Sequence, residues 1–535
     1  LPCLISSHQI FDFQHFPYNQ IKTRKTKQSL ETKTRYRIPF LALVFGFIFI
    51  VLSTITIFKN FHHKDSIYNL DKTTCLSNLN LKFLDQNVIC NQLVGKLNFS
   101  DFKLQDTQTF ELTSTSKDHL VAKIELPVTD FYSSLTNLTT DQFTDQNFLK
   151  ENQITLIQPD QLTPTQKLLS YQDNYYLDNQ TSGARFTILD IKKADSSTSE
   201  DQTKIQTIYD LLTPLFSKNQ PEQLVSFAET GVTALSRRLT LKLNQVNNGS
   251  YFADYLSDFL KTKTFTHISN EVSFKENCSG GYQTMVLCAD WRTLDTISAI
   301  GTDIVELTGN HNNDADTDNN LKTIAKYHEL GLKTVGGGEN LEKAKQPLDL
   351  NQSIRLLAYN HSTSSVANGQ IATATTPGAN PYSEDQVKLD LTAAKSEGKF
   401  TIVNIQYFEC FAYPNQPVAY PICDQPIQNQ KEFFRHLIDL GADMVVGTSA
   451  HQPQTYELYN QKPIYYGLGN LFFDQIYWPD TTRSLILTHY FKNNKLLQTR
   501  ISPTIYDNTF KPHLLDSTEA QNFLARLLLA SPKGN

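Results

Sequence analysis

The sequence feature that most constrains the fold is a unit of helix, glycine and apolar strand that occurs three times in the second half of the chain. It spans residues 297–311 (ISAIGTDIVELTGNH), 327–338 (YHELGLKTVGGG) and 436–451 (HLIDLGADMVVGTSAH). Glycine just past a helix end adopts the left-handed conformation that stops the helix. Helices that alternate with strands are typical of an α/β domain, in which polar loops collect at the carboxyl edge of the sheet. The pattern therefore predicts a layered α/β domain.

The first of these units ends in polar residues suited to chemistry. An apolar strand from Asp303 to Leu307 runs directly into Gly309, Asn310 and His311. Other apolar segments end in the same way, and the polar candidates at these ends are Asn270, Glu271, Asn310, His311, Glu409, His451 and Asn470. Carboxylates, imidazoles and amides that converge from separate strands suit a divalent metal or an oxyanion pocket. Each residue alone is more often a structural group, so their shared position is what favours a functional site.

Residues 38–58 (IPFLALVFGFIFIVLSTITIF) contain no charged side chain. As a helix they would span about 31 Å, the thickness of the hydrocarbon core of a bilayer. A buried core helix is the alternative, but an uncharged run of this length favours a transmembrane helix. The preceding segment is rich in Lys and Arg, which predicts a cytoplasmic N-terminus. We therefore expect a single-pass protein of the cell membrane with an uncleaved signal anchor and an extracytoplasmic remainder.

The cysteines agree with this topology. Cys3 lies on the predicted cytoplasmic side, and the other six form close pairs in the sequence: Cys75 with Cys90, Cys278 with Cys288 and Cys410 with Cys423. Six cysteines allow many connectivities, and short local disulfides are the least demanding choice in an oxidising exterior. Six buried thiols are the alternative. No pair has the spacing of a zinc or redox site.

Composition divides the chain further. The expected parts are a basic cytoplasmic tail (1–37), the transmembrane anchor (38–58), a tether (59–74), a small α/β or α+β accessory domain (75–218), the main α/β domain (220–503) and a C-terminal packing segment (504–535). Within the main domain, residues 361–381 are small and polar, which predicts either a mobile surface loop or a lid. The net charge of -6, with both signs interspersed, provides no basic stripe for nucleic acid.

Residues 230–475 resemble the CapA-type capsule synthesis proteins, a family associated with poly-γ-glutamate capsule and related to the calcineurin-like metallophosphoesterases. ELTGNHNNDAD (306–316) is similar to the family's strand followed by Asn-Asn-His and a downstream Asp. Residues 331–347 resemble its glycine-rich run, and residues 441–475, ending in GLGNLFFDQ, are similar to its last two motifs. The resemblance implies a metallophosphoesterase-like α/β/β/α sandwich.

Three positions depart from the family pattern. Val232 stands where the family has an aspartate, Gln406 stands at the histidine of its His-Trp-Gly-x-Glu motif, and Ser449 replaces the first histidine of Gly-x-His-x-His. Replacing a carboxylate with valine removes both a charge and a metal ligand. An ordinary dinuclear metal centre is therefore not expected, although a single metal or a metal-free acid/base pocket remains open.

The resemblance implies roles for the residues that are retained, and Arg237 is a further candidate beside them. Expected catalytic residues are Glu271, His311, Glu409 and His451; expected substrate-binding residues are Asn270, Asn310, Asn470 and Arg237; and His311, His451 and Glu271 are the candidate ligands for Mn²⁺, Zn²⁺ or Mg²⁺. The implied function lies in the synthesis of a capsule or another anionic cell-surface polymer or glycan. The protein would act there as a metal-dependent hydrolase or transferase, together with capsule-assembly proteins. The alternatives are a degenerate member that binds the polymer or a partner without turnover, and a scaffold in which these residues only cap strands.

Overall fold

The computed structural model describes residues 72–94, 96, 102–112, 120–193, 199–216, 223–279, 281, 286–407, 430–477 and 480–532. Residues 70–535 form one compact unit. The predicted anchor, Glu409, Cys410 and Cys423 all lie outside the described residues. In the part that is described, no helix is both long and apolar enough to cross a membrane.

The accessory domain is built on a mixed sheet in which β1, β2, β8, β3 and β5 follow one another and β6 pairs with β3. The strands are β1 (Leu79–Asn80), β2 (Phe102–Glu111), β3 (Leu120–Asp130), β5 (Thr155–Ile157), β6 (Gln166–Leu168) and β8 (Ser182–Lys193), with a separate pair β4 (Asn137–Leu138) and β7 (Ser170–Tyr171). The helices are α2 (Lys72–Ser77), α3 (Gln86–Leu93), α4 (Thr140–Thr144), α5 (Gln146–Glu151), α6 (Tyr176–Asn179) and α7 (Ser199–Leu212). The predicted disulfide between Cys75 and Cys90 is present and joins α2 to α3.

Two sheets form the main domain. The first runs β13 (Lys333–Val335), β12 (Ile304–Glu306), β11 (Phe265–Asn270), β9 (Val225–Glu229), β23 (Arg483–Lys492), β24 (Lys495–Ile505) and β25 (His513–Leu514), with β10 (Val232–Thr233) and β22 (Asn470–Phe472) attached beside β11. The second runs β15 (Leu348–Asp349), β16 (Ile354–Asn360), β18 (Phe400–Gln406), β19 (Met444–Gly447), β21 (Lys462–Tyr465) and β20 (Tyr456–Tyr459). Strands β9 and β11 to β13 are parallel to one another, as are β16, β18, β19 and β21.

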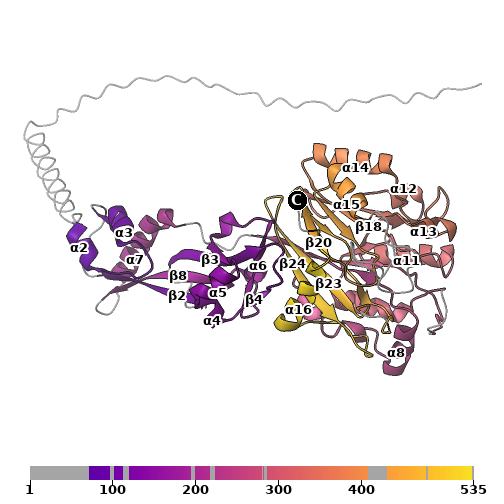
Figure 1. The fold of residues 1–535 in the computed structure, drawn as a ribbon, viewed down its shortest axis with the longest axis horizontal. Coiled ribbons are helices and arrows are strands. Elements are labelled where there is room, and N and C mark those ends of the chain that lie inside the picture. Colours follow the sequence, from indigo (N-terminus) through magenta and orange to yellow (C-terminus); the bar gives the residue numbers. More distant parts are fainter. Residues whose placement is uncertain are drawn as a thin grey trace, which may run out of the picture. The chain divides into compact units, whose positions relative to one another are not determined.

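Helices cover the outer faces of both sheets (Figure 1). On the first sheet they are α8 (Arg238–Val246), α9 (Ser257–Leu260), α10 (Leu294–Ala299) and α11 (Thr317–Glu329), and on the second they are α14 (Glu384–Ser396) and α15 (Gln430–Asp439). The domain also contains α12 (Leu341–Ala344) and α13 (Thr363–Ala367), and α16 (Ser517–Leu528) packs into the core between the sheets. Along β16, Leu356 and Ala358 pack between the sheets, whereas Leu357 and Tyr359 pack against α14 and α15. Side chains of a strand alternate between faces, so one strand contributes to both cores. The order is helix, sheet, sheet, helix.

The repeated unit of helix, glycine and strand is confirmed. Helices α10, α11 and α15 end near Gly301, Gly331 and Gly441, each of which has a positive φ. The polar segment 361–381 contains α13 and the short strand β17 (Gly378–Ala379), which pairs with β14 (Gly337–Gly338), and its role as a surface loop or a lid stays a prediction.

Candidate functional site

The short strand β10 gathers several predicted residues at the carboxyl edge of the first sheet. Val232 pairs with Ser269 of β11 on one side and with Asn470 of β22 on the other. The next residue, Thr233, pairs with Asn270 and accepts a hydrogen bond from the backbone N–H of Glu271 at 3.0 Å. Asn470, Asn270 and Glu271 therefore lie in one row across the strand ends.

The loop after β12 brings His311 to this row. A Cβ atom on Gly309 would lie 2.5 Å from Cα of Glu271, so only glycine allows the two backbones to approach this closely. His311 forms an isolated β-bridge with Val272, the residue after Glu271. Gly309 thus allows the loop to place His311 beside Glu271.

A carboxylate that was not among the predicted site residues orients His311. Nδ1 of His311 lies 2.6 Å from Oδ2 of Asp314, and both side chains are mostly buried. Asp314 also accepts hydrogen bonds from the backbone N–H of Leu287 and from Nε2 of Gln370, each at 2.9 Å. The carboxylate is held from three directions, which fixes the plane of the imidazole ring. The downstream Asp of the family motif was the available sequence signal for this role.

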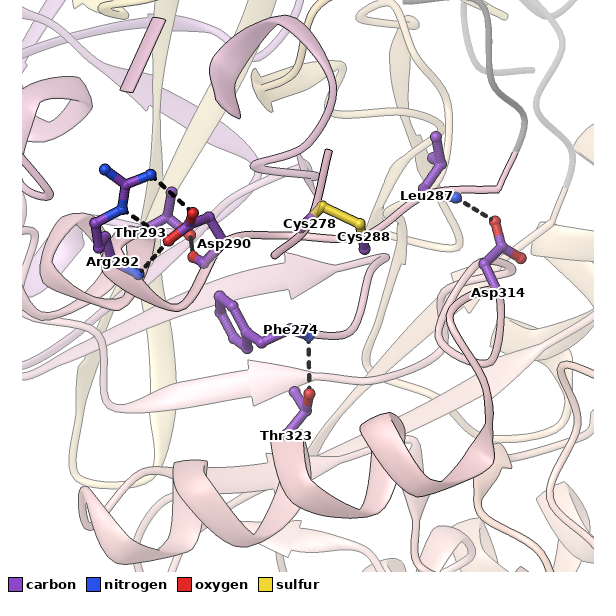
Figure 2. Close-up of a disulfide and its surroundings, with 9 residues drawn as sticks. All are labelled: Phe274, Cys278, Leu287, Cys288, Asp290, Arg292, Thr293, Asp314 and Thr323. Atoms are coloured by element: carbon purple, nitrogen blue, oxygen red, sulfur yellow. Dashed lines mark hydrogen bonds and ion pairs between the residues drawn. A yellow bond between two sulfur atoms is a disulfide. The ribbon is translucent and has the colours of Figure 1, made fainter. Parts of the chain in front are cut away.

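The second predicted disulfide supports this carboxylate. Cys278 and Cys288 are bonded, and Leu287, which donates to Asp314, is the residue before Cys288 (Figure 2). Figure 2 also shows Phe274 on the same segment, where its backbone N–H is held by Thr323 of α11 at 2.9 Å. The disulfide therefore lies next to the residue that holds Asp314 in place.

Replacing Cys278 and Cys288 with serine is expected to lower the free energy of unfolding by about 3 kcal/mol, because the short loop gains freedom in the unfolded chain. The same change should weaken the orientation of Asp314. Urea denaturation followed by circular dichroism checks the first effect, with the exposed pair Asp318→Asn and Glu329→Ala as the matched double control. Equal midpoints for the cysteine variant and the wild type would contradict it.

His451 is oriented by an amide. Its Nδ1 lies 2.9 Å from Oδ1 of Asn470, and its ring stacks on Phe473 at 5.2 Å between centroids. Arg237 forms an ion pair with Asp474, and its guanidinium lies 4.6 Å above the same Phe473 ring. The GLGNLFFD segment thus supplies three neighbouring supports, of which only Asn470 was predicted.

The second sheet contributes an amide and a cluster of aromatic rings at its own carboxyl edge. Nε2 of Gln406 donates to Oδ1 of Asn310 at 3.3 Å, which links the two sheets at the site. His361, which was not among the predicted site residues, packs against Tyr407 at 5.3 Å and Phe433 at 4.5 Å between ring centroids. Burial lowers the pKa of His361, which favours the neutral form of the imidazole. The signal for it was its place directly after β16.

A fully buried polar network lies directly beneath these strand ends. Glu306 of β12 accepts hydrogen bonds from Nδ2 of Asn404 and Oγ1 of Thr448, each at 2.8 Å, and lies 3.0 Å from Nε2 of His267. Oγ1 of Thr308 donates to it as well. Burial alone would raise the pKa of Glu306, but the hydrogen bonds and the neighbouring imidazole lower it below its ordinary value.

The same network extends across the sandwich. Asn404 of the second sheet also donates to Glu229 of β9, which lies 3.1 Å from Nε2 of His489. Both glutamates have no exposed surface. Thr308 and Thr448 immediately precede the segments that carry His311 and His451, so the network fixes the spacing between the two sheets at the site.

The donor set can be compared with that of a metal centre. Histidines that ligate metals usually have their second ring nitrogen held by a carboxylate or amide, and both His311 and His451 have this support. However, Val232 has no exposed surface and no donor, and Gln406 and Ser449 replace imidazoles. Within the described ranges, no three His, Cys, Asp or Glu side chains gather closely enough to hold a metal ion. The described residues therefore do not fit a complete metal centre.

Comparison with known proteins shows what the main domain is similar to. The sequence pattern of the bacterial capsule synthesis protein family PGA_cap matches residues 226–475, which contain all the strand ends described above. The chain is 25% identical over 286 residues to a capsule biosynthesis protein CapA from Bacillus anthracis, and 22% identical over 317 residues to a PGA biosynthesis protein CapA from Bacillus subtilis. Residues 226–475 are therefore similar to the CapA-type capsule synthesis proteins.

The CapA-type relatives are matched only in part. The alignments cover 52% and 58% of this chain, and 66% and 79% of the two Bacillus proteins, so the first is covered over just under two thirds of its length. A probable polyglutamine synthesis accessory protein from Mycobacterium tuberculosis is 26% identical over 186 residues, which is 33% of this chain and 46% of that protein.

Proposed function

We propose that this chain acts at the cell surface in the synthesis of a capsule or a related anionic polymer, and that its carboxyl-edge site performs hydrolysis or transfer on that polymer. The observation that carries the proposal is the His311–Asp314 pair, whose 2.6 Å contact orients an imidazole at the end of a strand. An imidazole held in this way is suited to general acid/base catalysis. The names of the relatives, which refer to capsule, PGA and polyglutamine synthesis, favour a glutamyl polymer as the substrate.

In this proposal Asp314 holds the Nδ1 proton of His311. Nε2 accepts a proton from the attacking group and donates it to the leaving group of the bond that is cleaved. Glu271 lies beside His311 and serves as a second acid/base group, a role that Glu409 could share. His451, held by Asn470, stabilises negative charge on the substrate, and Asn270 and Asn310 bind it. Residues 38–58 anchor the protein in the membrane, with the site outside the cell.

Binding without turnover is the second candidate, and a specific observation favours it. Val232 occupies the family's aspartate position at the centre of the row of strand ends, between Ser269 and Asn470. In this case the same edge would hold a surface polymer or an assembly partner without reacting. Elemental analysis of the purified chain measures its content of Mn²⁺, Zn²⁺ and Mg²⁺. A bound metal ion would favour hydrolysis or transfer over binding without turnover.

Replacing His311 with alanine tests the proposal in cells whose surface polymer depends on this protein. We expect at least a tenfold fall in surface polymer, because the acid/base group is lost while Asp314 keeps its contacts with Leu287 and Gln370. The measurement is polymer per cell at equal protein level, with His328→Ala on the exposed face of α11 as the matched control. Full polymer yield with His311→Ala would reject the catalytic role.

A further inference from the structure

A cavity of about 290 Å³ lies away from the carboxyl edge, where the accessory domain meets the main domain. One wall comes from the accessory domain and includes Asn137, Lys167 and Asp173. The other comes from β24 and the start of α16 and includes Arg500 and Ser517. Its volume lies near the lower end of the range for small-ligand sites.

Lys167 is the unusual member of this lining. Its Nζ donates to the backbone carbonyl of Ser133 at 2.7 Å, and among the described residues it has no ion pair. An ammonium group can donate three hydrogen bonds, so two remain for a ligand. Burial lowers the pKa of Lys167 to about 7, and no neighbouring carboxylate raises it again.

The other charged groups around the cavity have hydrogen-bond or ion-pair partners of their own. Asp173 accepts hydrogen bonds from Asn137 and Ser517, and Asp516 caps the first turn of α16 through the backbone N–H of Glu519. On β3, Asp130 accepts from the backbone N–H of Tyr132. Arg500 is paired with Asp178 at 2.7 Å and lies 4.8 Å from the ring of Tyr175. Lys167 is therefore the cation of this cavity that lacks a counter-charge.

We propose that this cavity binds a small oxyanion, a carboxylate or a phosphate, through the Lys167 ammonium group. The ligand supplies the counter-charge that the protein does not, and it accepts hydrogen bonds from the two remaining N–H groups of Lys167. The site is partly buried, and charge-assisted hydrogen bonds are strong there. Because the two walls belong to different domains, the bound anion contacts both. This site goes beyond the proposed function and does not depend on it.

Binding through Lys167 has a defined pH dependence. The bound anion requires the protonated amine, and in the free protein the amine loses its proton as the pH rises through about 7. Affinity for an anion that does not itself titrate should therefore fall roughly tenfold between pH 6 and pH 8. Glutarate is close to such an anion, since both of its carboxyl groups are mostly ionised at pH 6 and fully ionised at pH 8.

The test is isothermal titration calorimetry of the full chain with glutarate at pH 6, 7 and 8, and with inorganic phosphate at pH 6. We expect binding at pH 6 by at least one probe, and the stronger probe identifies the carboxylate or the phosphate as the preferred anion. The affinity for glutarate should be roughly tenfold lower at pH 8 than at pH 6. Lys167→Met should lose at least tenfold in affinity at pH 6, whereas Lys150→Met, on the exposed face of α5, should not.

Lys167→Met should also keep its fold, because it removes a buried charge; its melting temperature should exceed that of the wild type at pH 6 and approach it at pH 9. Lys167→Arg retains a cation that does not titrate and should bind glutarate equally at pH 6 and pH 8. Absence of binding by both probes at pH 6, or equal binding by Lys167→Met and the wild type, overturns the proposal. His311→Ala should leave the titration unchanged, so failure here and failure of the proposed function are separate results.

Discussion

Replacing Glu306 with alanine is expected to lower the free energy of unfolding by about 3–5 kcal/mol, which is a large part of the stability of an ordinary domain. The side chain is fully buried and accepts hydrogen bonds from both sheets. Asn404 and Thr448 donate from the second sheet, and Thr308 donates from the first sheet, to which Glu306 belongs. Its removal leaves these donors and His267 buried without a partner. The cost is the desolvation of those groups in addition to the lost contact.

Urea denaturation at neutral pH measures this effect. Glu306→Gln keeps the size of the side chain and should cost less than the alanine variant, and Glu329→Ala on the exposed end of α11 should change stability by less than about 0.5 kcal/mol. A loss of under 1 kcal/mol for Glu306→Ala would show that the network does not hold the two sheets together.

The contribution of Glu306 should also depend on pH. Its pKa in the folded protein lies below the ordinary value. A carboxyl group of this kind stabilises the fold at pH values above its unfolded pKa, which is about 4.3, and the contribution is lost as the pH falls through the lower folded value. The stability difference between the wild type and Glu306→Gln should therefore shrink on acidification below pH 4.

Replacing Asp314 with asparagine is the second change with a large expected effect. Nδ1 of His311, the backbone N–H of Leu287 and Nε2 of Gln370 all face this carboxylate, and an asparagine amide would turn a donor toward at least one of them. The imidazole would then lose its tautomer and orientation. For polymer turnover by the purified chain we expect a loss of about 100-fold or more.

Asp318→Asn, on the exposed first turn of α11, is the matched control and should leave the rate unchanged. A merely structural role for Asp314 would reduce the folded fraction without altering the pH profile of the rate. A role through His311 shifts that profile, because the carboxylate stabilises the protonated imidazole. An unshifted profile with a normal rate would contradict the orienting role.

The sequence was sufficient to predict the elements that repeat. Glycines at helix ends and the polar residues after the strands predicted the α/β domain and the edge at which His311 and His451 lie, because these are local signals. The two local disulfides that fall within the described residues were also predicted, since short local loops are the least demanding of the possible connectivities.

The supporting contacts were not predictable in the same way. Glu306 meets Asn404 and Thr448 only because two sheets pack face to face, and these residues lie 98 and 142 positions apart in the sequence. In the sequence, Glu306 lies within the predicted strand from Asp303 to Leu307, and His361 begins the polar segment 361–381, so neither residue was a candidate for the site. Their roles depend on the tertiary arrangement, which no local pattern encodes.

The most direct test of the central claim is the chain length of a γ-linked glutamyl polymer after incubation with the purified chain, measured by size-exclusion chromatography with light scattering. If the His311 site performs hydrolysis or transfer, the wild type changes the length distribution and His311→Ala does so at least 100-fold more slowly. A polymer that is bound but unchanged in length by the wild type would contradict the catalytic account and favour a site that only holds its ligand.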